Sequence, residues 1–179
     1  MSRFRKWAKR EYSLAARIAA ILPAGVLFLG LFPYLFLVIC PSLDERLGLG
    51  RFSAGVASIL VGGILSAVGL ALGQWSILTQ FTRASGTPLP MMPTQKLLTT
   101  GPFRYCRNPM TLGTILAYGG LTIAAGTPTG LTIVILLASL LLLYLKLVEE
   151  KELAERFGDE YLAYKREVPF ILPRMPRRN

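Results

Sequence analysis

Histidine is absent from this chain, and cysteine occurs only at positions 40 and 106. A histidine-based catalytic triad is therefore excluded. The usual protein ligands for zinc, haem iron or an iron–sulfur cluster are also nearly all missing. We expect no metal site and no catalysis that depends on a titrating imidazole.

Charged residues are scarce as well. They make up 17% of the 179 residues, whereas 53% are hydrophobic and the mean hydropathy is +0.49. The apolar residues form long runs, and about 20 of them suffice to cross a hydrocarbon core of about 30 Å. The net charge of +10 could indicate nucleic-acid binding, but the basic residues lie beside the apolar runs, where anionic lipid headgroups attract them. These features predict a multi-pass membrane protein with no nucleic-acid partner.

The apolar runs predict an all-α fold: one domain, residues 1–179, forming a membrane helical bundle of about four transmembrane helices. The predicted spans are residues 14–40, 54–78, 111–126 and 128–148. The first is too long for a cleaved signal peptide. Basic residues gather near both termini and in the connector 79–110, so the positive-inside rule predicts that all three are cytoplasmic. Residues 149–168 alternate apolar and charged positions at helical spacing, which predicts an amphipathic helix.

Small residues recur on one face of the second predicted span, at Gly62, Ser66, Gly69 and Gly73. Such a face allows another helix to approach closely. Alternatively, it leaves room for a ligand lodged between helices. The sequence leaves both interpretations open.

The segment 101–113, GPFRYCRNPMTLG, is polar and turn-forming, and the third predicted span follows it directly. The next two spans have similar lengths and are joined at residues 126–128. An antiparallel hairpin therefore returns Glu149 to within about one or two helical turns of the level of Asn108. We expect a basic, amide-bearing loop and a pair of carboxylates to meet at one membrane face.

Each of these groups also has a simpler interpretation. Glu149 and Glu150 could merely begin a helix, where acidic residues favour the dipole. Arg104 and Arg107 could be anchors that face lipid headgroups. Taken together, however, they offer cation and amide groups for a carboxylate, and carboxylates for an ammonium group. This combination fits an amino-acid-like zwitterion with a bulky apolar remainder.

Four motifs carry a resemblance to a known family: QKLLTTGPF at 95–103, RNPMTLG at 107–113, EE at 149–150 and FGDEY at 157–161. They resemble the integral-membrane methyltransferases, which include isoprenylcysteine carboxyl methyltransferases and phosphatidylethanolamine N-methyltransferases. The resemblance covers about residues 60–173.

The resemblance implies methyl transfer from S-adenosylmethionine to a lipophilic acceptor, of the isoprenylcysteine carboxyl or phospholipid amine type. Glu149 would contact the polar end of the cofactor, and Glu150 would support it. Glu150 and Arg107 are the predicted catalytic residues. The implied cofactor-binding residues are Gln95, Lys96, Leu97, Leu98, Phe103, Asn108, Pro109, Met110, Thr111, Glu149 and Glu150, with Gly69, Leu70 and Ala71 from the phospholipid branch.

Three positions depart from the family pattern. Asn108 stands in place of the motif histidine, Thr111 in place of a tyrosine, and Leu145 in place of an arginine that handles a carboxyl substrate. These changes favour an aminophospholipid acceptor over a prenylated cysteine. Displacement at an activated sulfonium depends on alignment and exclusion of water rather than on a strong base, so a chain without histidine can promote it.

The competing interpretation is a small transporter or a non-enzymatic assembly protein. Transport sites usually lie near the middle of the membrane, whereas the charged groups here are predicted at its cytoplasmic face. We therefore expect an enzyme whose partners are membrane lipids and a lipid or prenylated acceptor. Its expected location is the plasma or inner membrane of a bacterium, or the endoplasmic reticulum of a eukaryote.

Overall fold

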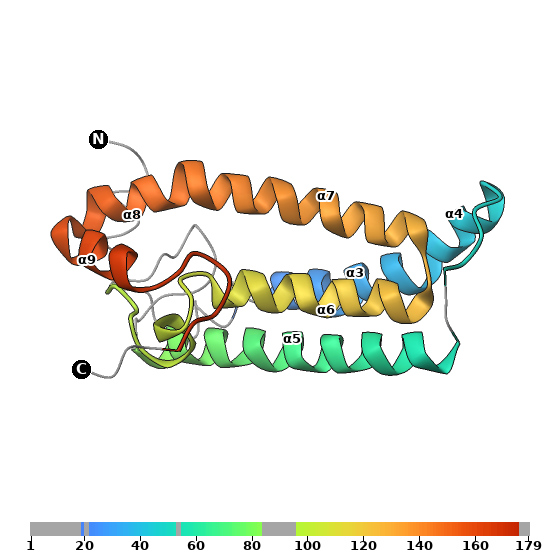
Figure 1. The fold of residues 1–179 in the computed structure, drawn as a ribbon, viewed down its shortest axis with the longest axis horizontal. Helices are drawn as coiled ribbons and strands as arrows, with labels where there is room; N and C mark the ends of the chain where they lie inside the picture. Colours follow the sequence, from blue (N-terminus) through green and yellow to red (C-terminus); the bar gives the residue numbers. More distant parts are fainter. Residues whose placement is uncertain (1–18, 20–21, 53–54, 84–95, 176–179) are drawn as a thin grey trace.

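The computed structural model describes residues 19, 22–52, 55–83 and 96–175. Within these residues the chain is helical and contains no β-strand. Figure 1 shows α5 (Val56–Arg83) lying along α6 (Pro109–Ala125), with α7 (Pro128–Tyr144) on the opposite side of α6. The start of the first predicted span and Gln95 lie outside the described residues.

The first helix is continuous from Leu22 to Arg46 but contains two wider turns. Its segments are η1 (Leu27–Leu31), α3 (Phe32–Tyr34), η2 (Leu35–Ile39) and α4 (Cys40–Arg46). The π-turns η1 and η2 precede Pro33 and Pro41. Proline has no N–H, and its ring crowds the carbonyl four residues earlier, so a wider turn accommodates it. The helix thus continues past residue 40, where the predicted span ends.

Three helices are long and apolar enough to cross a membrane: Leu22–Arg46, Val56–Arg83 and Pro128–Phe157. The remaining predicted span corresponds to α6, which is apolar and has 17 residues. At 1.5 Å per residue it is about 26 Å long. The predicted all-α membrane bundle is confirmed.

The small face of α5 packs directly on α6. A Cβ atom added to Gly69 would lie 2.4 Å from the backbone nitrogen of Ala117, and one added to Gly62 would lie 2.4 Å from the carbonyl oxygen of Gly120. The hydroxyl of Ser66 donates a hydrogen bond to the Ala117 carbonyl at 2.9 Å. Of the two interpretations of this face, close helix packing is the one that the structure bears out.

At the far end of the bundle, a buried carboxylate ties the first helix to α7. Asp44 is 1% exposed and accepts hydrogen bonds from the hydroxyl of Thr127 and, at 3.0 Å, from the backbone N–H of Thr129. The carboxylate therefore lies at the positive end of the α7 helix dipole. Gly126 closes the α6–α7 turn in the left-handed region, at φ 64°.

At the opposite end, α7 continues through the π-turn η4 (Leu145–Glu149) into α8 (Glu150–Phe157), and α9 (Asp159–Glu167) follows. Gly158, at φ 54°, divides the predicted amphipathic segment 149–168 into these two helices. The C-terminal segment 168–175 then returns beside the short helix η3 (Gly101–Arg104), as Figure 1 shows. This end of the bundle holds the two motif segments that begin and end the predicted hairpin, RNPMTLG at 107–113 and EE at 149–150.

Candidate functional site

The C-terminal segment holds the connector in place just before α6. The backbone N–H of Arg107 donates to the carbonyl of Pro169 at 2.9 Å, and that of Arg174 donates to Tyr105 at 3.0 Å. The side chain of Asn108 does not cap α6; its Nδ2 donates to the carbonyl of Phe170 at 2.9 Å. The motif segment is therefore fixed by residues about sixty positions later in the chain.

The π-turn η4 decides which glutamate of the pair faces inward. In this turn the backbone N–H of Glu150 donates to the carbonyl of Leu145, five residues earlier. Residues 145 and 150 therefore share the buried face, and they are 6% exposed each. Glu149 is rotated away from it and is half-buried. A π-turn of this kind within an α-helix often marks a functional site.

Glu150 lies at the centre of a cluster of cations contributed by three elements. Its Oε1 is 2.7 Å from Nη1 of Arg107 in the connector, and both side chains are 7% exposed. Its Oε2 is 2.8 Å from Nζ of Lys165 on α9 and 3.4 Å from Nζ of Lys146 on η4. The contact with Arg107 is an ion pair without hydrogen-bond alignment, since Oε1 has no hydrogen-bond partner in the described chain. The cluster joins the connector, the last span and α9.

Two buried tyrosines of α9 line the same region. The hydroxyl of Tyr164 donates to the carbonyl of Phe103 at 2.6 Å, and Nη1 of Arg107 lies 3.5 Å from the hydroxyl of Tyr161. Burial raises the pKa of both phenols, so each keeps its proton at neutral pH. The ring of Phe170 lies beneath two of the cations, 4.9 Å from Nζ of Lys146 and 5.7 Å from the guanidinium carbon of Arg107.

Glu149, unlike its neighbour Glu150, has no cation within ion-pair distance among the described residues. In residues 19, 22–52, 55–83 and 96–175 it forms neither a hydrogen bond nor an ion pair. Elsewhere in the cluster, Nε of Arg107 is buried and likewise has no hydrogen-bond acceptor in the described chain. One acceptor and one donor thus remain available at the edge of the cluster.

The other predicted cofactor residues differ in how far they are exposed to solvent. Leu98, Phe103 and Pro109 are buried, Leu97, Asn108, Met110 and Thr111 are half-buried, and Lys96 is exposed. Gly69 is buried in the contact between α5 and α6, whereas Leu70 and Ala71 on the same helix are exposed. The structure brings Arg107 and Glu150 together as predicted; the binding roles of the individual residues stay predictions.

Sequence reasoning missed three members of the cluster: Lys146, Lys165 and Phe170. Lys146 lies within the last predicted span. Lys165 belongs to the polar positions of the amphipathic pattern, and Phe170 follows that pattern, so neither stood out. The available signal was the four-residue spacing from Tyr161 to Lys165, which places an aromatic ring and a cation on one face of a helix. No group of three residues of metal-binding type occurs in the described part of the chain.

The comparisons with known proteins bear on this arrangement. Searches of curated proteins and of solved structures gave no significant match. The family model described as phospholipid methyltransferase matches residues 57–160, more than half of the chain, and this range includes both motif segments and the Arg107–Glu150 ion pair. The match confirms the resemblance to integral-membrane methyltransferases. The chain belongs to the phospholipid methyltransferase family.

Proposed function

We propose that this protein is an integral-membrane methyltransferase that transfers a methyl group from S-adenosylmethionine to the amine of a phospholipid, at the cytoplasmic face. The observation that carries the proposal is the family match over both motif segments, which the 2.7 Å Arg107–Glu150 ion pair joins at one end of the bundle. The cytoplasmic assignment follows from the basic connector and termini.

The residues at the cluster edge fit the polar end of this cofactor. The unpartnered carboxylate of Glu149 suits an ammonium group, and the buried Nε–H of Arg107 suits a carboxylate. Leu98 and Phe103 pack together as an apolar cluster that can exclude water, and the carbonyl of Phe103 accepts a hydrogen bond from Tyr164. When bound, S-adenosylmethionine would supply a methyl group already activated by its sulfonium.

The ion pairs suggest different roles for the two glutamates. Glu150 has three cationic partners, so we assign it the role of holding Arg107 and α9 in position. Glu149 is the carboxylate left to bind an ammonium group. Because methyl transfer from a sulfonium depends chiefly on alignment and a dry site, neither residue must act as a strong base.

An amine acceptor is favoured over a carboxyl acceptor by the family match and by Leu145. That side chain is 6% exposed, and the resemblance places at this position the arginine that handles a carboxyl substrate. Only a neutral amine can attack, so activity should rise with pH as the amine deprotonates. A carboxylate acceptor, with a pKa near 4, predicts little change above about pH 6. A flat profile from about pH 6 to 9, with label released as methanol by base, would favour a carboxyl ester.

The decisive experiment supplies membranes containing the protein with methyl-labelled S-adenosylmethionine and then extracts the lipids. We expect the label in the phospholipid fraction, carried on the headgroup nitrogen. Membranes from cells that lack the protein provide the background. Label found only in protein or in water-soluble products contradicts a phospholipid acceptor.

Cofactor binding is tested separately with Glu149→Gln. Loss of one charged hydrogen-bond partner should weaken S-adenosylmethionine binding by about 1.5–3 kcal/mol. Glu155→Gln is the matched control, because Glu155 is exposed on α8 and takes part in no ion pair with the described residues. Equal dissociation constants for the two variants would remove Glu149 from the cofactor site.

A further inference from the structure

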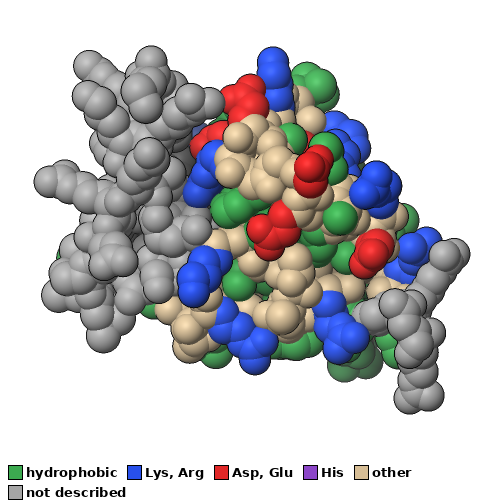
Figure 2. Space-filling model, turned by 90° about the vertical axis from the view of Figure 1, so that its left-hand side faces the viewer, with side chains coloured by type: hydrophobic (Ala, Val, Ile, Leu, Met, Phe, Trp, Pro, Cys, Tyr) green, Lys and Arg blue, Asp and Glu red, His purple; other side chains and the backbone are tan. Residues whose placement is uncertain are grey.

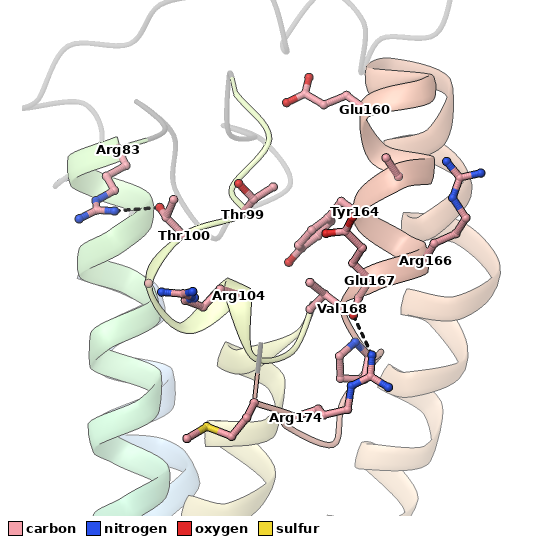
Figure 3. Close-up of a pocket in the computed structure, with 14 residues that line it drawn as sticks. Arg83, Thr99, Thr100, Arg104, Glu160, Tyr164, Arg166, Glu167, Val168 and Arg174 are labelled. Carbon is pink, nitrogen blue, oxygen red and sulfur yellow. Dashed lines mark hydrogen bonds between the residues drawn. The ribbon is translucent and has the colours of Figure 1, made fainter. Parts of the chain in front are cut away.

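A hollow with a volume of about 960 Å³ opens at the same end of the molecule as the ion-pair cluster. Figure 3 shows it between the end of α5, the connector, α9 and the C-terminal segment. None of the described residues implied for cofactor binding lines it. It is therefore distinct from the site described above, although Tyr164 on its wall contacts Phe103.

The charged residues that line the hollow are four arginines and two glutamates: Arg83, Arg104, Arg166, Arg174, Glu160 and Glu167. Among the described residues, none of these four arginines forms an ion pair with a carboxylate. Figure 2 views this end of the molecule and shows basic and acidic side chains spread over the face, with apolar side chains between them. Arginines thus outnumber carboxylates along the hollow, which favours an anionic ligand.

The arginines differ in how they are held. Nη1 of Arg83 donates to the hydroxyl of Thr100 at 2.9 Å, and Nη2 of Arg174 donates to the carbonyl of Glu167 at 3.1 Å. Among the described residues, the side chain of Arg104 has a cation–π contact with Tyr105, at 5.9 Å, and no hydrogen bond, so its donors can reach a ligand. In Figure 3, Arg104 lies between α5 and α9, whereas the guanidinium of Arg166 lies on the far side of α9.

The position of the hollow indicates where its ligand comes from. Arg83 is the last residue of a 28-residue helix that is apolar enough to span a membrane. Large apolar side chains are exposed on the last turns of that helix, among them Leu78 at 60% and Trp75 at 46%. The hollow therefore opens at the depth of lipid headgroups, next to a surface that acyl chains can cover. Basic pockets at the ends of transmembrane helices bind lipid headgroups.

We propose that this hollow binds the phosphate of a membrane phospholipid, with Arg83 and Arg104 as its principal donors. The planar guanidinium matches phosphate oxygens geometrically and carries its charge at any physiological pH. The acyl chains lie along the exposed apolar face of α5. Binding here requires no methyl transfer, so it is measurable in the absence of cofactor.

The test uses the full-length protein in detergent and native mass spectrometry to obtain dissociation constants. The probes are dihexanoylphosphatidylethanolamine, dihexanoylglycerol, which lacks the phosphate, and glycerophosphoethanolamine, which lacks the acyl chains. We expect the complete lipid to bind most tightly. Equal binding of dihexanoylglycerol refutes a phosphate site, and equal binding of glycerophosphoethanolamine assigns the hollow to a soluble phosphate ester and overturns the lipid proposal.

Arg104→Gln should weaken binding of the complete lipid about tenfold, the effect of losing one charged hydrogen-bond donor. Arg166→Gln is the matched control, since it removes the same charge at the same end of the molecule. Arg166 borders the hollow, but its guanidinium lies on the far side of α9. Thermal unfolding verifies that both variants are folded, and Arg83→Gln serves as a second test with the same expected loss. If Arg166→Gln weakens binding as much as Arg104→Gln and Arg83→Gln do, the loss comes from the lower net positive charge at this end of the molecule, and the proposed site is refuted.

Discussion

Replacing Glu150 by glutamine tests the central feature of the site. The change keeps the shape of the side chain and removes the charge that compensates the guanidinium of Arg107, whose side chain is 7% exposed. Breaking a buried ion pair from one side costs about 3–5 kcal/mol, because the remaining charge is left without a partner. Lys146 and Lys165 are 51% and 38% exposed and are screened by solvent, so they add little.

For a chain of this size, 1 kcal/mol shifts the unfolding midpoint by about 2–4 °C, so Glu150→Gln should lower it by roughly 6–20 °C. The assay is thermal unfolding of the purified protein in detergent. Glu149→Gln is the control, since Glu149 forms no hydrogen bond or ion pair with the described residues. Equal midpoints for the two variants would refute the assignment of Glu150 as the buried, charge-compensating residue.

A double variant makes the test sharper. If the penalty comes from an unpaired guanidinium, then adding Arg107→Met to Glu150→Gln should recover part of the lost stability. A double variant that is less stable than either single variant would mean that the cluster stabilises the fold through packing rather than through charge compensation.

Two further predictions concern the fold and its orientation. Gly69→Ala should lower the yield and unfolding midpoint of the protein, because its Cβ would lie 2.4 Å from a backbone nitrogen of α6. Gly63→Ala is the control and should be neutral, because nothing that packs against the helix lies within 4 Å of its Cβ. Equal effects of the two substitutions contradict the close α5–α6 packing. A cysteine placed at the exposed Ser42 should react with an impermeant maleimide added to intact cells, whereas one placed at Lys151 should react only after permeabilisation. Background labelling should be low because both native cysteines are buried. The reverse pattern contradicts a cytoplasmic site.

The sequence by itself determined the class of the protein and the region of its site. Long apolar runs cannot be accommodated except as membrane helices, whose backbone groups are satisfied internally. Because both arms of the hairpin are helical, residue counting placed the connector beside the glutamate pair, and the structure confirms this with the Arg107–Glu150 contact of 2.7 Å. Periodicity also identified the small face of α5, although it could not decide between packing and ligand binding.

Only the tertiary structure decided what each charged residue does. The sequence does not distinguish the two adjacent glutamates. The π-turn that buries Glu150 and leaves Glu149 half-buried contains no proline, so no local sequence signal predicts it. Likewise, Lys165 reaches Glu150 because α9 folds back after Gly158. Helix and span boundaries depend on local composition, whereas charge pairing depends on how distant segments pack, and local patterns do not encode that arrangement.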